Sequence, residues 1–135
     1  FVREGEMDRL FRYYRFGEDY AGRRDRTLLL LLYHTGLRAA EVLGLNLGDV
    51  DLSTAQLRVT GKGNKQRVVP FGAELTNALR DYLPVRREFL QRFSTDENAL
   101  FLSSRGHRLG YSTLRTMVRT ALSAVTTQQK KSQPE

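Results

Sequence analysis

The sequence predicts a mainly helical fold that carries one small antiparallel β-hairpin. Apolar residues recur at helical spacing through most of the chain, as at Met7, Leu10 and Tyr14. The period changes between Gln56 and Val69, where two short runs rich in β-branched residues flank a glycine-containing segment. With 135 residues, 40% of them hydrophobic, the chain is long enough to bury a core of its own, and we expect residues 1–135 to form a single domain.

The predicted helices follow from the apolar pattern and from the glycines that interrupt it. They are Glu4 to about Phe16, about Arg23 to Thr35, Ala39 to Leu43, Ala73 to about Phe93, and Tyr111 to about Val125. The second helix is apolar on nearly all sides and should be buried, and Gly36 suits its left-handed cap. Pro84 is a candidate break in the fourth helix. We expect a turn or one further helical turn at Asn46–Asp49 and a polar, frayed end at Thr126–Glu135.

The predicted hairpin pairs Gln56–Thr60 with Gln66–Val69. Its tip is Gly61-Lys62-Gly63-Asn64-Lys65, where the two glycines allow a sharp bend. Further along, Ala99–Ser103 is expected to be a strand or an extended segment, and Ser104–His107 a turn.

Basic residues are unevenly distributed along the chain, whose formal net charge is +7. Arg58–Pro70 and Asn98–Pro134 both carry several Arg and Lys residues and no acid, whereas the sequence between and before them is balanced. Two acid-free blocks indicate two surfaces that meet one polyanion, although basic faces are equally often only solvated. Most of the 22 basic residues are Arg, whose guanidinium fork matches phosphate oxygens.

Composition and patterning exclude several classes of protein. There is no cysteine and there are only two histidines, His34 and His107, so disulfides, thiolate chemistry and a zinc site are not expected. The longest apolar run, Leu28–Tyr33, is far too short to span a bilayer. The charged residues of Phe1–Arg9 argue against a signal peptide. We therefore expect a soluble, cytoplasmic protein without a membrane partner or a bound metal.

Two segments carry residues suited to phosphate chemistry. Arg38 lies between two predicted helices, a junction that can aim a guanidinium outward while its stem is held. Taken alone, Arg38 is more simply a helix-end residue or a partner of Glu41. Lys62 lies between Gly61 and Gly63 on a bendable tip, from which an ammonium can reach a phosphate and donate a proton. Taken alone, Lys62 is more simply a lysine that discourages edge-to-edge sheet pairing.

Together, however, these segments resemble the phage integrase family, the tyrosine recombinases, and most closely the Xer type. His34–Val42 is similar to the family's TGLR-x-x-E-(L/I) box, and Asp49–Asp51 to the D-(I/V)-D that follows it. Val59–Pro70 is similar to the GKGNK-x-R-x-(V/I)-P hairpin almost residue for residue. Leu100–Ser103, Arg105-Gly106 and the helix from Tyr111 resemble the next block more loosely, so the likeness extends from near Phe1 to about Lys131.

The resemblance implies DNA strand exchange by transesterification, in DNA integration or chromosome dimer resolution. A tyrosine hydroxyl attacks a backbone phosphate, forms a 3′-phosphotyrosine and releases a 5′-hydroxyl, with no metal, ATP or other cofactor. Arg38 matches the first catalytic arginine, which holds the non-bridging oxygens of the transition state. Lys62 matches the hairpin lysine, the general acid for the departing oxygen. Glu41 matches a supporting acid that orients Arg38.

The resemblance also implies a DNA interface outside these three residues. The first turn of the last predicted helix, Tyr111, Ser112 and Thr113, would face phosphates or base edges. Arg115 and Arg119 lie four residues apart on the polar face of that helix and would straddle a DNA backbone, the alternative being a solvated basic face. We expect that Lys65, Arg67 or both touch phosphate.

The chain also departs from the family. The H-x-x-R box, a further His or Trp and the nucleophilic tyrosine belong C-terminal to the last matched helix, and none of the six tyrosines has the expected context. We therefore expect a truncated catalytic domain, without the nucleophile segment or the N-terminal core-binding domain, that is inactive alone although its parent is an enzyme. The expected partners are double-stranded DNA and, in the full-length protein, other recombinase protomers. The alternatives are a non-catalytic DNA-binding protein derived from an integrase and a basic protein-interaction domain.

Overall fold

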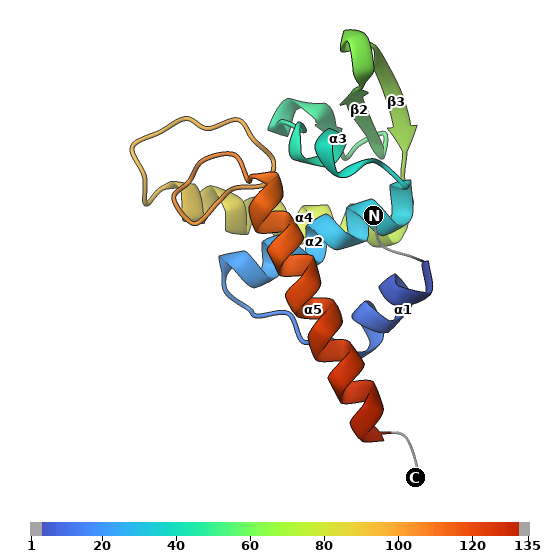
Figure 1. The fold of residues 1–135 in the computed structure, drawn as a ribbon. Coiled ribbons are helices and arrows are strands. Elements are labelled where there is room, and N and C mark those ends of the chain that lie inside the picture. The colour runs from blue at the N-terminus through green and yellow to red at the C-terminus, as the bar shows by residue number, and fades with distance from the viewer. Residues whose placement is uncertain (1–3, 133–135) are drawn as a thin grey trace.

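The computed structural model describes residues 4–132 and confirms the predicted fold class, helices with a small antiparallel sheet (Figure 1). Its elements are α1 (Glu4–Tyr13), α2 (Tyr20–Thr35), α3 (Ala39–Leu43), the 3-10 turn η1 (Leu47–Asp49), β1 (Val50–Asp51), β2 (Gln56–Thr60), the 3-10 turn η2 (Lys62–Asn64), β3 (Gln66–Pro70), α4 (Ala73–Leu90) and α5 (Tyr111–Ser132).

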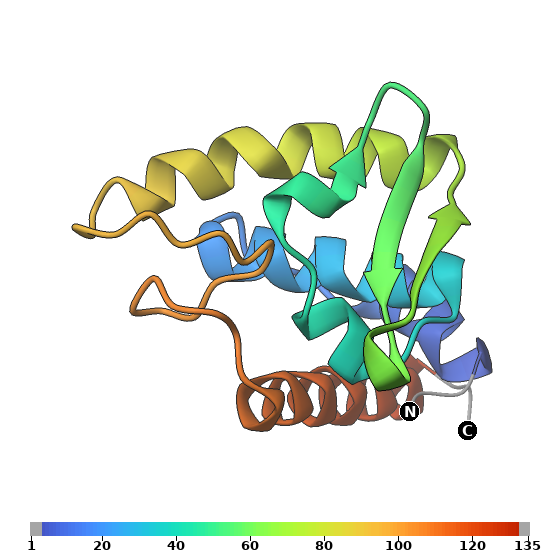
Figure 2. The same cartoon turned by 90° about the horizontal axis from the view of Figure 1, so that it is seen from above.

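Helix α2 is the centre of the core. In Figure 2 the helices α4, α2 and α5 lie in three successive layers, with the sheet and α3 at one end. All five leucines of Leu28–Leu32 are buried, because neighbours cover this stretch of α2 on every side. Helix α1 packs against both α5 and α2 on the other side of the molecule. The hairpin and the start of α3 therefore lie against a well-packed group of helices.

The ends of α2 are fixed by local hydrogen bonds. The helix begins at Tyr20, earlier than the predicted start near Arg23, because the carboxylate of Asp19 accepts the backbone N–H of Gly22 at 2.9 Å. It ends as predicted at Thr35, where Gly36 has a φ of 67° and donates its N–H to the Leu32 carbonyl. This left-handed residue turns the chain sharply toward α3.

The sheet has the strand order β1-β2-β3 and is antiparallel throughout. The predicted hairpin is confirmed, with Val59 opposite Arg67 and Thr60 opposite Gln66. Along β2, Leu57 and Val59 are buried while their neighbours are exposed, which fixes the register of the strand. Strand β1 was not predicted, because a strand of two residues is too short to show a pattern.

Helices α4 and α5 both differ from the prediction. Pro84 does not break α4, which runs through it to Leu90 rather than to Phe93. Helix α5 does not fray after Val125 but continues to Ser132, since residues 126–132 contain neither Gly nor Pro and glutamine and lysine are good helix formers. Gln133–Glu135, the rest of the predicted frayed end, lie outside the described residues.

Buried arginines anchor the segment of residues 97–109 that links α4 to α5. Arg86 of α4, 3% exposed, donates to the carbonyl oxygens of Glu97 and Ala99 at 2.6–2.9 Å. Arg24 of α2, 6% exposed, donates to the Leu102 carbonyl at 2.9 Å. Residues 99–103, expected to be a strand or an extended segment, lie outside the three-stranded sheet and form single bridges, Asn46 to Ala99 and Leu102 to Arg108.

Candidate functional site

The two motif segments meet at one pocket on the surface. Its volume is about 500 Å³, and it is lined by Gly36, Arg38, Glu41, Gly61, Lys62, Lys65, Gln66 and Arg67. Residues from the α2–α3 junction and from the hairpin, far apart in the chain, therefore share one cavity. The pocket contains four basic side chains and a single carboxylate, so it suits an anion that has several oxygens.

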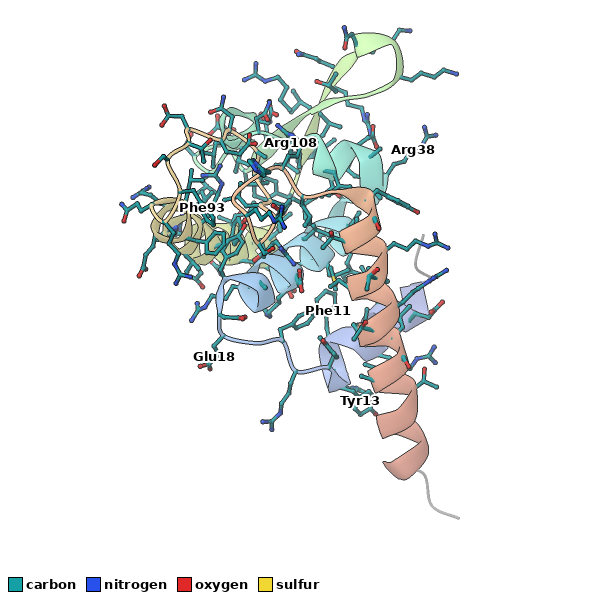
Figure 3. The ribbon with its side chains drawn as sticks, turned by 60° about the vertical axis from the view of Figure 1, so that its left-hand side comes forward. Phe11, Tyr13, Glu18, Arg38, Phe93 and Arg108 are labelled. Carbon is teal, nitrogen blue, oxygen red and sulfur yellow. The ribbon has the colours of Figure 1, made fainter. Side chains whose placement is uncertain are left out.

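Arg38 occupies the first exposed position after the α2–α3 turn. Leu37 is 7% exposed and anchors the turn in the core, while Arg38 projects away from the helices (Figure 3). The backbone N–H of Arg38 donates to Oε1 of Glu41 at 3.0 Å, which closes the first turn of α3. The buried side chain of Leu37 and the hydrogen bond to Glu41 therefore hold the backbone of Arg38 in place. Within residues 4–132 the guanidinium of Arg38 makes no hydrogen bond or ion pair.

Glu41 holds Arg67 of β3 in a bidentate ion pair. Nη1 of Arg67 donates to Oε2 at 2.6 Å and Nη2 donates to Oε1 at 3.2 Å. The Glu41 side chain is 12% exposed and that of Arg67 is 49% exposed. The hydrogen bonds from Arg67, followed by the one from the Arg38 backbone, lower the pKa of Glu41 below its ordinary value. Glu41 is thus a carboxylate at neutral pH and joins α3 to the hairpin.

The hairpin tip carries Lys62 and Lys65 as exposed side chains. The N–H of Gly61 donates to the Lys65 carbonyl at 2.8 Å and closes the tip, where Gly63 and Asn64 have φ values of 71° and 61°. A Cβ at Gly61 would lie 3.3 Å from both Nη1 of Arg67 and Oε2 of Glu41. Glycine at this position lets the strand backbone pass directly beside the ion pair.

Glu41 differs in its contacts from the role expected of it. Its carboxylate accepts the backbone N–H of Arg38, but it holds the guanidinium of Arg67 and not that of Arg38. The resemblance assigned Glu41 to Arg38, and the spacing of three residues on one helical turn suggested the same partner. Arg67 lies 26 residues away, and only the fold brings it there.

The predicted DNA-facing residues of α5 lie outside this pocket. Tyr111, Ser112 and Thr113 are exposed in its first turn, and Tyr111 is 51% exposed. Arg115 and Arg119 are exposed, whereas Leu114, Val118 and Ala121 on the opposite face are buried. These residues form a second polar surface, on a helix that contacts α3 (Figure 1).

Arg108 is a structural cation that the charge pattern did not reveal. Its guanidinium donates to the carbonyl oxygens of Leu43 at 2.8 Å and Leu45 at 3.0 Å, and also to Oδ1 of Asn46. It thereby caps the carboxyl end of α3 and ties it to the segment that leads into α5. In the sequence, Arg108 was indistinguishable from the other arginines of the acid-free block.

The pocket lining includes no tyrosine among the described residues. Tyr20 and Tyr82 are buried between α2 and α4, where burial raises the pKa of both hydroxyls. Tyr33 donates to the carboxylate of Asp8 at 2.6 Å, and Tyr14 packs edge-on against Phe16. Within residues 4–132 there is also no cluster of metal-ligating side chains, and no helix there has the length and apolarity needed to cross a membrane.

Comparisons with known proteins identify relatives of this chain. The chain is 46% identical over 95 residues to the tyrosine recombinase XerC of Corynebacterium glutamicum and 43% identical over 111 residues to XerC of Chlorobaculum tepidum. These matches cover 70% and 80% of the chain but only 30% and 33% of the relatives. The chain thus spans about a third of the length of those proteins.

Solved structures show the same fold. The XerA recombinase superposes with a TM-score of 0.73 and 31% identity, covering 93% of this chain and 42% of XerA. The XerH recombinase bound to its difH substrate superposes with a TM-score of 0.72 at 23% identity, covering 90% and 34%. The phage integrase family matches residues 1–134, so nearly every residue is aligned with it. The chain belongs to the phage integrase family.

Proposed function

We propose that the chain is the part of a tyrosine recombinase catalytic domain that binds duplex DNA and supplies two of its catalytic side chains, Arg38 and Lys62. The observation that carries the proposal is the shared pocket, because the two residues matched by separate motifs line one cavity. The XerC relatives and the XerH structure bound to a difH substrate support DNA as the partner.

The chemistry of the two side chains fits a phosphodiester in the pocket. The Arg38 guanidinium has two parallel N–H groups for the non-bridging oxygens, and it stabilises the charge that grows there in the transition state. Lys62 stands on the hairpin tip and protonates the departing 5′-oxygen. Lys65 adds a phosphate contact beside it. The nucleophilic tyrosine and the H-x-x-R residues come from a segment of the recombinase outside this chain.

The exposed start of α5 extends the DNA interface beyond the pocket. In our proposal, Tyr111, Ser112 and Thr113 contact phosphates or base edges, and Arg115 and Arg119 contact the backbone. Strand exchange joins two duplexes, so the complete recombinase acts with other protomers of its kind.

Salt-dependent DNA binding tests the first half of this function. Each phosphate contact contributes about −0.9 to the slope of log K against log salt, so roughly five contacts predict a slope of about −4 to −5. Fluorescence anisotropy of a labelled duplex at several salt concentrations measures it. Binding that is independent of salt, or no binding at low salt, would contradict the DNA-binding function.

Strand cleavage tests the second half. In a recombinase that joins this chain to a tyrosine-bearing segment, Arg38→Ala should lower the cleavage rate of a nicked substrate about 100- to 1000-fold, while binding persists through the other cations. Wild-type cleavage in Arg38→Ala would show that Arg38 is not a catalytic residue. DNA binding without cleavage by the unaltered recombinase would favour the alternative, a DNA-binding protein derived from an integrase and without chemistry of its own.

A further inference from the structure

Arg67 differs from the other cations of the pocket because its charge is already paired. Both of its terminal nitrogens donate to Glu41, whereas the side chains of Arg38, Lys62 and Lys65 make no ion pair within residues 4–132. A phosphate that approached Arg67 would also approach the Glu41 carboxylate, 2.6 Å from Nη1, and would be repelled by it. Arg67 is therefore poorly suited to hold a phosphate.

The ion pair is instead placed to set the position of the hairpin. Glu41 accepts hydrogen bonds from the backbone of Arg38 and from Arg67, so a single carboxylate joins the start of α3 to β3. Gly61, directly before Lys62, packs against the same pair of side chains. The fork of a guanidinium fixes the orientation of its partner as well as the distance, which a single ammonium would not.

We propose that Arg67 is a positioning residue. Its ion pair with Glu41 fixes the hairpin so that the tip places Lys62 opposite Arg38 in the pocket. In this arrangement Arg38, Lys62 and Lys65 contact the phosphate, and Arg67 does not. The role of Arg67 rests on the proposed function, since it acts through the proton donor Lys62.

A matched pair of variants separates a positioning residue from a phosphate ligand. Arg67→Gln and Lys65→Gln each remove one positive charge from exposed sites two positions apart on the hairpin. For this chain and a labelled duplex, Lys65→Gln should flatten the salt slope by about 0.9, and Arg67→Gln should leave it nearly unchanged. Equal flattening by both variants would overturn the proposal and show that Arg67 binds phosphate directly.

Cleavage of two substrates tests the positioning itself. In a recombinase that carries this chain, Arg67→Gln should slow cleavage of an ordinary nicked substrate at least tenfold without weakening its binding. A substrate whose 5′-bridging oxygen is replaced by sulfur has a leaving group that needs no acid, so the same variant should cleave it at the wild-type rate. A defect of equal size on both substrates would overturn the proposal.

The outcomes also separate this role from the proposed function. If Lys62→Ala is not rescued by sulfur, the assignment of Lys62 as the acid fails and the proposed chemistry fails with it. If Lys62→Ala is rescued and Arg67→Gln is not, only the positioning role fails. Circular dichroism and hydrogen exchange of the buried Leu57 and Val59 amides show that each variant is folded.

Discussion

The hydroxyls of Tyr20 and Tyr82 lie 2.7 Å apart inside the core and form a hydrogen-bond relay with a single direction. Tyr82 donates its proton to the Leu100 carbonyl at 2.7 Å, so its oxygen is free to accept the proton of Tyr20. The Tyr20 oxygen in turn accepts the N–H of Leu102 at 3.0 Å. The relay fastens residues 100–102 to α2 and α4 from the inside.

Breaking this relay should destabilise the domain. Tyr82→Phe removes a hydroxyl from a residue that is 1% exposed and leaves the Leu100 carbonyl without this donor, a loss of about 1–3 kcal/mol. Urea denaturation followed by circular dichroism measures it. Tyr14→Phe is the control, since the Tyr14 hydroxyl makes no hydrogen bond with another described residue and its loss should change stability by less than about 0.5 kcal/mol. Equal stabilities for the two variants would refute the relay.

The pH dependence of the ion pair follows from its pKa shift. Because Arg67 lowers the pKa of Glu41, the pair stabilises the folded chain above the pKa of an unfolded glutamate and loses that effect as the pH falls through the lower, folded value. NMR titration of the Glu41 carboxyl carbon should give a midpoint below that of a free glutamate. In Arg67→Gln the midpoint should rise toward the ordinary value, and an unchanged midpoint would show that Arg67 is not the cause.

The chain alone should not become covalently attached to DNA. No tyrosine lines the pocket in the described residues, and none of the six in the sequence has the context of the family's nucleophile. Incubation with a nicked substrate that traps the phosphotyrosine, followed by a denaturing gel, checks this. A shifted band would identify one of these tyrosines as a nucleophile and contradict the assignment of that role to another segment.

The roles of Arg38 and Lys62 should separate chemically. In a recombinase that carries this chain, Lys62→Ala removes a proton donor worth roughly 100- to 10,000-fold in rate, and a sulfur leaving group makes that donor unnecessary. Cleavage of the 5′-thio substrate should therefore recover in Lys62→Ala but not in Arg38→Ala, whose missing charge stabilisation sulfur does not replace. Recovery of both variants would place the proton donor elsewhere.

Sequence reasoning predicted the parts of the site that depend on local pattern. The α2–α3 junction is marked by Gly36, and the hairpin by its glycines and β-branched strands, so Arg38 and Lys62 could be placed on the right elements. The ion pair between Glu41 and Arg67 could not be predicted, because no spacing rule relates residues 26 positions apart. The packing of α3 against β2, together with the register of β3 beside β2, brings them together.

The buried arginines escaped prediction for a different reason. Arg24 and Arg86 are almost fully buried, although arginine is seldom found inside proteins unless it is paired. Many of their acceptors are backbone carbonyls, which leave no mark in the sequence, so nothing distinguished them from the surface arginines that the charge pattern suggested. The same holds for Arg108 at the end of α3.

Anchoring residues 97–102 through carbonyl oxygens has a consequence for how the protein can evolve. Every amino acid has a carbonyl, so the hydrogen bonds from Arg24, Arg86 and Tyr82 do not themselves depend on the side chains of this segment. The side chains of Arg105 and His107 in the following turn are exposed, so they can be replaced while the entry into α5 stays in place. Substitutions in this turn can therefore alter the surface before α5 without rebuilding the core.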